Sequence, residues 1–105
     1  MEQAFLDRVR EAAAQRILFL PHAIRQMARP ERMITPEQVR EVVVTGELIE
    51  HYPDDPRGTS CLLLAVDESG RPIHVVCAPK DEYLAVITAY VPDPEQWSDD
   101  YRHRR

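Results

Sequence analysis

Few cysteines, few glycines and no long apolar run occur in this sequence, and each shortage excludes a class of protein. Cys61 and Cys77 are the only cysteines among its 105 residues, and both lie in apolar runs, which favours reduced, buried thiols over a disulfide framework. The three glycines are far apart, so no glycine-rich phosphate loop is present. No apolar run approaches the roughly 20 residues that a membrane span needs, and the first residues lack the order of a secretion signal. We therefore expect a cytoplasmic protein that does not enter a membrane.

The length and the charge indicate one acidic domain over residues 1–105. A chain of 105 residues is long enough for one hydrophobic core and too short for two. The net charge of -5 is uneven: residues 1–40 hold seven arginines and five acids, residues 41–100 hold three bases and thirteen acids, and the last five residues add three arginines. This acidity disfavours broad electrostatic capture of nucleic acid, although a local basic patch remains compatible with it.

Helical signals occupy the first part of the chain. Apolar residues recur at helical spacing through Glu2–Arg16, which predicts an amphipathic helix that lies against a sheet. A short β-rich run, Ile17–Leu20, is stopped by Pro21. The segment His22–Ala28 then resumes a helical pattern, which Pro30 must terminate.

A third helix has the clearest start signal in the sequence. Thr35 is a typical N-cap, Pro36 suits the first helical position, and Gln38 completes a capping box. Gly46 is expected to end this helix as a left-handed C-cap.

Strand signals fill the second part of the chain. The extended runs, separated by turn-rich segments, are Glu47–Tyr52, Ser60–Val66, Pro72–Ala78 and Tyr83–Val91. Because short turns join the last three runs, an antiparallel meander is expected. Helices early and strands late indicate an α+β domain, in which N-terminal helices pack on a roughly four-stranded antiparallel sheet. Residues 98–105 are expected to form a short helix or a frayed basic tail.

The side chains that remain for chemistry are those of a ribonuclease that needs no metal. The four histidines show no close pair and the cysteines lack metal-site spacing, so we expect neither a metal site nor a cofactor. RNA cleavage needs a base for the ribose 2′-OH, an acid for the leaving oxygen, and cations for the charged transition state. The candidate catalytic residues are His22 and His74 as acid and base, Arg25, Arg29 and Arg32 as cations, and Tyr90 as a proton donor or base-stacking group.

Each candidate also has a purely structural interpretation. In a buried strand the ring of His74 would bond a backbone carbonyl or a carboxylate, and His22 would cap its helix. The arginines would form a solvated face with ion pairs to Glu31, and Tyr90 would be a packing residue. For His74 the deciding observation is its face of the sheet: toward the helices it is a core residue, and beside His22 it is a catalytic candidate.

Several blocks of sequence occur in a distinctive order and spacing between Phe19 and Trp97. They include Ile34-Thr-Pro-Glu-Gln-Val39, Gly46-Glu-Leu-Ile-Glu50, Arg71-Pro-Ile-His-Val-Val76 and Ile87-Thr-Ala-Tyr-Val-Pro-Asp-Pro-Glu-Gln-Trp97. Together they resemble the bacterial domain-of-unknown-function family 4258, which is similar to small toxins of the RelE and BrnT type. Those toxins place helices on an antiparallel sheet and cleave RNA, and the family tends to be encoded beside antitoxin-like proteins.

The resemblance implies a candidate ribonuclease toxin with an antitoxin-like protein partner, and it directs attention to His22, His74 and Tyr90. The family commonly has an arginine four residues after the first histidine, where this chain has Gln26 preceded by Arg25. Which arginine takes the phosphate-binding role is therefore open.

Two hypotheses follow from the sequence. The first is a RelE-like ribonuclease that acts on RNA. The second is a non-catalytic interaction module, whose sheet edge or apolar face binds a partner protein or a second copy in a homodimer. The ribonuclease requires His22, His74 and at least one arginine at one open cleft.

Overall fold

The computed structural model describes residues 2–105, which form three helices and five strands. In chain order these elements are α1 (Glu2–Gln15), β1 (Ile17–Phe19), α2 (Pro21–Met27), α3 (Pro36–Thr45), β2 (Glu47–Tyr52), β3 (Ser60–Val66), β4 (Pro72–Pro79) and β5 (Leu84–Tyr90). The α+β class is confirmed, and the helices and the four long strands match the predicted ranges to within about one residue. No helix of residues 2–105 combines the length and the apolar character that crossing a membrane requires.

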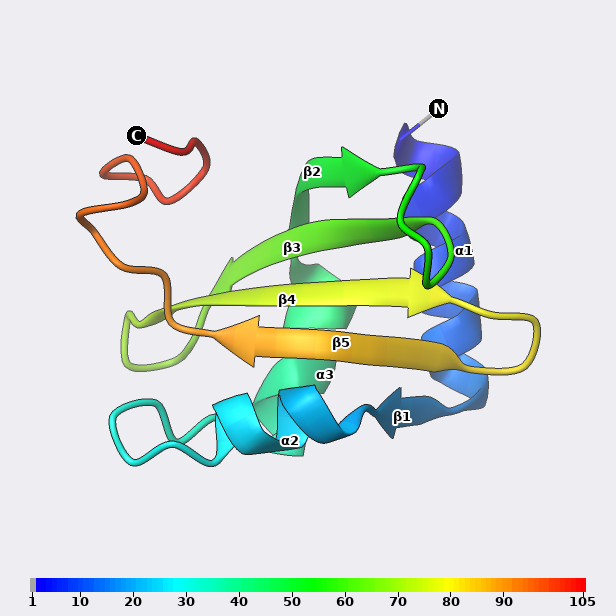
Figure 1. Cartoon of the computed structure of the whole chain (residues 1–105), viewed down its shortest axis with the longest axis horizontal. Coiled ribbons are helices and arrows are strands. Elements are labelled where there is room, and N and C mark those ends of the chain that lie inside the picture. The colour runs from blue at the N-terminus through cyan, green and yellow to red at the C-terminus, as the bar shows by residue number, and fades with distance from the viewer. Residues whose placement is uncertain (1) are drawn as a thin grey trace.

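The five strands form one mixed sheet in the order β1-β5-β4-β3-β2. Strands β2 to β5 pair antiparallel with their neighbours, whereas β1 pairs in parallel with β5 and places Ile17 opposite Leu84. The predicted four-stranded, wholly antiparallel sheet is therefore wrong in strand number and in direction. The β-rich run Ile17–Leu20 was predicted and contains β1, but its place in the sheet was not, because its partner β5 is distant in the chain. Strand β4, which carries His74, is central in the sheet as expected (Figure 1).

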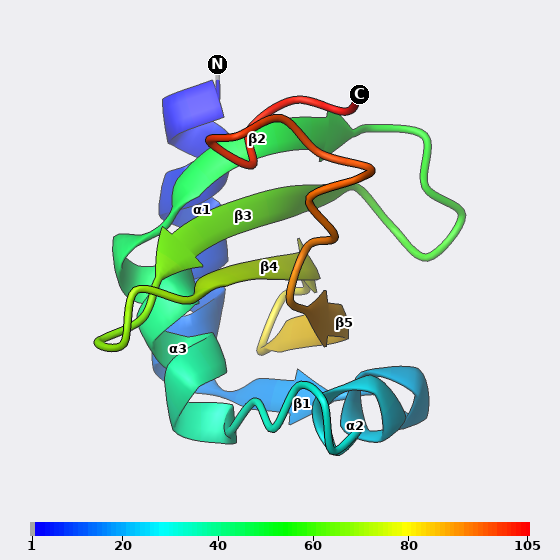
Figure 2. The ribbon, with the colours of Figure 1, turned by 90° about the vertical axis from the view of Figure 1, so that its left-hand side faces the viewer.

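Helices α1 and α3 cover one face of the sheet, and the hydrophobic core lies beneath them (Figure 2). Buried side chains from both helices and from β3, β4 and β5 fill this core, among them Val9, Val43, Cys61, Val75 and Val86. Both cysteines are buried free thiols, as predicted. Helix α2 follows β1 directly and lies along β5 (Figure 1). The opposite face of the sheet, which is turned toward the reader in Figure 1, is called the front face below.

Local sequence determines the start of α3, and close packing determines its end. Thr35 Oγ1 accepts a hydrogen bond from the Gln38 amide at 3.1 Å, and Gln38 Oε1 accepts one from the Thr35 amide at 2.8 Å. The predicted capping box is thus present. Gly46, however, has φ -72° and ψ 163°, so the predicted left-handed C-cap is wrong. A side chain at this position would collide with the carbonyl oxygen of Val42, which explains why glycine suits an extended conformation here.

The residues after β5 form an irregular segment that lies on the front face (Figures 1 and 2). This C-terminal segment, residues 92–105, closes on itself through the paired residues Trp97 and Arg104 and through a hydrogen bond of 2.9 Å from the Arg105 amide to the Gln96 carbonyl. Neither predicted form, a short helix or a frayed tail, is found. The reason is Trp97, which is only 3% exposed and anchors the segment to the sheet.

Candidate functional site

The front face carries polar side chains from the central strands. Side chains alternate along β4, so Val75 points into the helix-covered core while His74 and Val76 point to the front. Across the ladder to β5, Tyr90 lies opposite His74 and Thr88 lies opposite Val76. His74 therefore does not face α1 and α3.

His74 is nevertheless fully buried, because the C-terminal segment covers it. Its exposed fraction is 0%. The ring atom Nε2 lies 2.9 Å from the carbonyl oxygen of Tyr101, Nδ1 lies 3.2 Å from the hydroxyl of Tyr90, and the indole of Trp97 packs edge-on with ring centroids 4.5 Å apart. A backbone carbonyl can only accept, so Nε2 carries the hydrogen and Nδ1 accepts from the tyrosine hydroxyl.

This environment keeps the ring of His74 neutral. Burial lowers the pKa of His74 below its ordinary value, and the hydrogen bond to the Tyr101 carbonyl opposes the shift only in part. Burial likewise raises the pKa of Tyr90. Both groups are uncharged and both ring nitrogens of His74 are engaged, so in this arrangement His74 attaches the C-terminal segment to the sheet.

Ion pairs fasten the C-terminal segment to β2. Arg104 Nη2 lies 3.0 Å from Glu50 Oε1, and its guanidinium carbon lies 4.7 Å from the centre of the Trp97 ring. Arg102 Nε lies 3.0 Å from Glu47 Oε1. Burial opposes the ionisation of Glu50, but hydrogen bonds from Arg104 and Tyr52 outweigh it and leave the pKa of Glu50 below its ordinary value. Glu50 is therefore a stable anionic partner for the segment.

A hollow of about 380 Å³ lies on the front face beside α2. This α2 hollow is lined by His22, Tyr52, Asp55, Pro56, Arg57, Val76, Ile87 and Thr88. His22 comes from the first turn of α2, Tyr52 from the end of β2, and Arg57 from the loop between β2 and β3. Since Val76 is two residues from His74 on β4, their Cα atoms are about 7 Å apart. The α2 hollow and the buried His74 are neighbours on one face.

Hydrogen bonds hold the polar groups of the α2 hollow in place. Asp55 accepts from Arg57 Nε at 3.0 Å, from Arg57 Nη2 at 3.2 Å and from Ser60 Oγ at 2.7 Å, and these bonds hold the pKa of Asp55 well below its ordinary value. Burial, together with the hydrogen bond to Glu50, raises the pKa of Tyr52 to about 12. The α2 hollow thus offers a fixed guanidinium and a protonated phenol beside the exposed imidazole of His22.

The arginines named as candidates lie in three different places. Arg32 is half-buried with its guanidinium carbon 6.0 Å from the centre of the Tyr90 ring, so it extends the contacts of His74 and Tyr90. Arg25 is exposed three residues after His22, on the same side of α2. Arg29 is exposed and pairs with Glu31 at 2.7 Å. The structure therefore groups Arg32 with His74 and Tyr90, groups Arg25 with His22, and leaves Arg29 apart.

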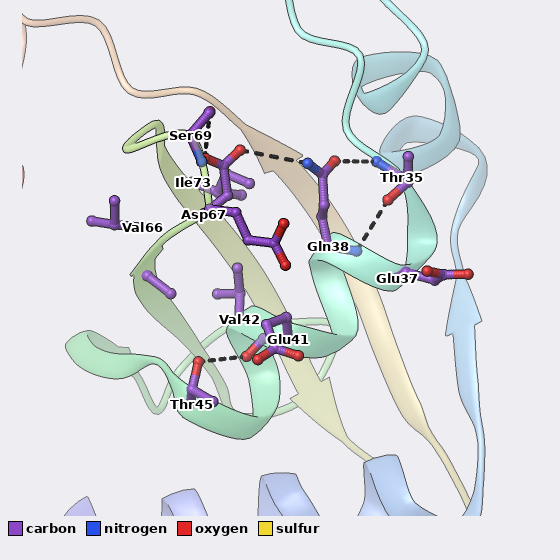
Figure 3. Close-up of a pocket in the computed structure, with 12 residues that line it drawn as sticks. Thr35, Glu37, Gln38, Glu41, Val42, Thr45, Val66, Asp67, Ser69 and Ile73 are labelled. Carbon is purple, nitrogen blue, oxygen red and sulfur yellow. Dashed lines mark hydrogen bonds between the residues drawn. The ribbon is translucent and has the colours of Figure 1, made fainter.

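A larger hollow of about 690 Å³ lies between α3 and the turn that joins β3 to β4 (Figure 3). Glu37, Glu41 and Glu68 contribute carboxylates to it, Val42 forms part of its apolar wall, and Val66 is 63% exposed. No basic side chain of the described residues lines this acidic groove. Its charge suits a basic group and disfavours a phosphate. Among residues 2–105, no cluster of three histidine, cysteine or carboxylate side chains is placed to hold a metal ion.

A comparison with known families accounts for the central part of this fold. Residues 19–91 match a domain of unknown function, DUF4258. The chain belongs to the DUF4258 family. The DUF4258 match includes His22, His74 and Tyr90, whereas α1 and the C-terminal segment lie outside it. No curated protein and no solved structure matches the chain.

Sequence reasoning about this DUF4258 domain missed Tyr52, Arg57 and Thr88. Arg57 stands in the turn-rich loop Pro53–Gly58, where an arginine between turn residues in an acidic region is a detectable signal. Its approach to α2 depends on tertiary structure and has no local signature. The cover that Trp97 provides for His74 was also missed, because the C-terminal segment has no periodic pattern.

Proposed function

We propose that this DUF4258 domain is a RelE-like ribonuclease toxin that needs no metal, and that RNA binds in the α2 hollow. One observation carries the proposal: three separate elements bring the imidazole of His22, the phenol of Tyr52 and the guanidinium of Arg57 to a single hollow. Its volume of about 380 Å³ lies within the range of small-molecule clefts and suits one nucleotide. His74 is buried and does not line this hollow, and neither do the candidate arginines, so the requirement of one open cleft shared by His22, His74 and one of those arginines is not met. The proposal therefore takes the α2 hollow alone as the reacting centre.

Basic groups gather around the α2 hollow, where Arg57 pairs with the carboxylate of Asp55, although the whole chain is acidic. Arg25 shares one side of α2 with His22, and the ammonium of Lys80 donates a hydrogen bond to the carbonyl of Arg57. Such a local patch attracts phosphate over short range. An acidic chain with one basic patch favours a short contact with RNA over binding along a duplex.

The proposed reaction transfers the RNA phosphodiester to the neighbouring ribose 2′-oxygen. His22 takes the 2′-OH proton, the 2′-oxygen forms a bond to phosphorus, and the bond from phosphorus to the 5′-oxygen breaks. The phenol of Tyr52, which donates a hydrogen bond to Glu50 in the free protein, gives its proton to the departing 5′-oxygen. Arg57 and the Thr88 hydroxyl donate hydrogen bonds to the phosphate as charge develops. The products are a 2′,3′-cyclic phosphate and a 5′-hydroxyl.

Substitutions in the α2 hollow test this proposal. His22→Ala and Arg57→Ala should each lower the RNA cleavage rate by roughly 100-fold or more, because they remove the base and a phosphate donor. The matched control is Arg40→Ala, since Arg40 is exposed on α3 and lies outside the α2 hollow. The assay measures cleavage of free RNA and of RNA on translating ribosomes, with thermal melting to verify that each variant is folded.

Two results contradict the ribonuclease. One is a wild-type chain that cleaves RNA in neither form. The other is a folded His22→Ala variant that cleaves as fast as the wild type.

A second candidate function, a non-catalytic interaction module, is favoured by the acidic groove of Figure 3. The exposed Val66 beside the carboxylates of Glu41 and Glu68 suits a basic, partly apolar segment of an antitoxin-like protein. Co-purification with the protein encoded by the adjacent gene tests this function. Glu41→Lys with Val66→Asp should abolish the complex, and a complex that survives both changes excludes the groove as its site.

A further inference from the structure

We infer that the C-terminal segment is a cap over the front face, and that its opening exposes His74 beside the α2 hollow as a second acid–base group for RNA cleavage. The chemical consequence rests on the proposed ribonuclease function. The opening itself is a property of the fold and is measured without any substrate.

The closed cap touches the front face through a small number of groups. Trp97 and the Tyr101 carbonyl cover His74, and the guanidinium of Arg104 joins Trp97 to Glu50. These contacts lie over the neutral imidazole or beside it, and Arg102 adds an ion pair to Glu47 on β2. The segment therefore closes one particular part of the front face and leaves the neighbouring α2 hollow open.

The backbone of the C-terminal segment satisfies its own hydrogen bonds and does not extend the sheet. The amide of Ser98 donates to the His103 carbonyl at 2.7 Å, and the amide of Arg105 donates to the Gln96 carbonyl at 2.9 Å. The arginines of the ion pairs to β2 are 44% and 62% exposed, so their ends of the pairs are solvated, although Glu50, the partner of Arg104, is only 24% exposed. Exposed ion pairs contribute little to stability. The segment can therefore leave the sheet without breaking any strand pairing.

The boundary of the family match coincides with the start of this segment. DUF4258 covers residues 19–91, and the C-terminal segment begins at Pro92. The matched range thus includes His22, His74 and Tyr90, and the residues that cover His74 follow it in the chain.

Opening would change the chemistry of the front face. His74 would lose the carbonyl that holds its Nε2 hydrogen and the indole that excludes water. It would then be a solvated imidazole on the same face as Val76, whose Cα lies about 7 Å from that of His74 and whose side chain lines the α2 hollow. In the open form His74 would replace Tyr52 as the acid that acts with His22 in RNA cleavage, with Tyr90 and Arg32 next to it.

The test weakens the cap in the full-length chain. Trp97→Ala combined with Arg104→Ala removes the anchor and its ion pair to Glu50. The matched control is Arg105→Ala, because Arg105 belongs to the same segment and its side chain contacts only Pro94 and Asp99 of that segment. The readout is the rate at which diethyl pyrocarbonate modifies each histidine, mapped by mass spectrometry. The exposed His22 and His51, which lie outside the C-terminal segment, serve as internal standards.

We expect the modification of His74 to accelerate roughly tenfold or more in the double variant, with wild-type rates in Arg105→Ala and a cooperative melting transition in both. A folded double variant whose His74 stays protected overturns the cap. So does a double variant that is globally unfolded, because the segment would then be part of the core.

Hydrogen exchange on the wild type tests the same opening without substitution. The amides of Tyr101 and Arg105, which are bonded only within the segment, should exchange faster than those of β4. If the amides of the C-terminal segment and of β4 exchange equally slowly, the proposed opening of the cap is contradicted.

RNA cleavage is then measured on the double variant. Faster cleavage supports the role given to His74. An accessible His74 with no cleavage is consistent with the cap and counts against the ribonuclease.

Discussion

At the scale of single residues, the neutral ring of His74 connects three parts of the protein. It belongs to β4, accepts a hydrogen bond from Tyr90 on β5, and donates one to Tyr101 in the C-terminal segment. A protonated ring would carry a hydrogen on both nitrogens, and the bond from Tyr90 would have to reverse. The hydrogen bonds around His74 therefore fit the neutral ring and not the protonated one.

This preference predicts a pH-dependent stability. Because burial lowers the pKa of folded His74 below the ordinary 6.5, the unfolded chain binds the proton first, and stability present above pH 6.5 is lost as pH falls below it. The loss cannot exceed about 1.4 kcal/mol per pH unit for one proton. Carboxylates such as Glu50, with a pKa lowered from 4.5, contribute only at more acidic pH. Chemical denaturation of the wild type and of His74→Gln between pH 7 and pH 5 measures the effect.

The His74→Gln variant should be less stable at pH 7 and should show a flatter stability profile across this range, because glutamine does not titrate. An equal slope in both proteins would show that other groups cause the pH dependence. Arg104 and Glu50 also face the ring, but they form an ion pair whose charges stay constant through this range.

The sequence allowed part of the role of His74 to be predicted. An imidazole in an apolar run indicates a buried strand position, and the alternation along β4 assigns it to one face once the strand is located. The cover over that face was not predictable, because it depends on how an irregular segment packs against β2 and β4. The pairing of Arg104 with Glu50 joins residues far apart in the chain and has no local pattern.

At the scale of elements, α3 shows how far local sequence determines structure. Its capping box satisfies backbone donors with the side chains of Thr35 and Gln38, so its start is encoded within four residues. Its end at Gly46 is decided by contact with the carbonyl of Val42, which the local pattern did not reveal.

Removal of the capping box at the start of α3 should therefore weaken the whole domain measurably. Thr35→Ala is expected to lower the free energy of unfolding by about 1 kcal/mol, because one orphan amide of α3 loses its acceptor. The matched control is Thr45→Ala, since Thr45 lies in the same helix and its hydroxyl only donates to the Glu41 carbonyl. Denaturant titration compares the two, and equal effects would show that the capping box adds nothing.

The pairing of β1 marks the limit of prediction for elements, since the β-rich run Ile17–Leu20 itself was recognised. Three residues with partly buried side chains form a strand only because they pair in parallel with β5. The four long strands were predictable because each one carries its own apolar pattern between turn residues. A short strand takes its structure from its partner.

At the scale of the whole molecule, the sheet separates stability from proposed chemistry. The face under α1 and α3 is a packed apolar core, and the front face holds the α2 hollow, His74 and the C-terminal segment. His22, Arg25, Arg57 and Lys80 lie around the α2 hollow together with one carboxylate, Asp55, which pairs with Arg57. The acidic groove is lined by carboxylates and, among the described residues, by no basic side chain. RNA bound in the α2 hollow and a basic partner bound in the acidic groove would occupy different surfaces and would not compete.

The most direct test of the central claim is the chemistry of the RNA ends that the protein produces. RNA incubated with the purified chain is analysed by mass spectrometry, beside the same reaction with His22→Ala. The proposed use of the 2′-oxygen as nucleophile predicts fragments that end in a 2′,3′-cyclic phosphate and begin with a 5′-hydroxyl, formed by the wild type and lost in the variant. Intact RNA, or fragments that begin with a 5′-phosphate, would contradict it.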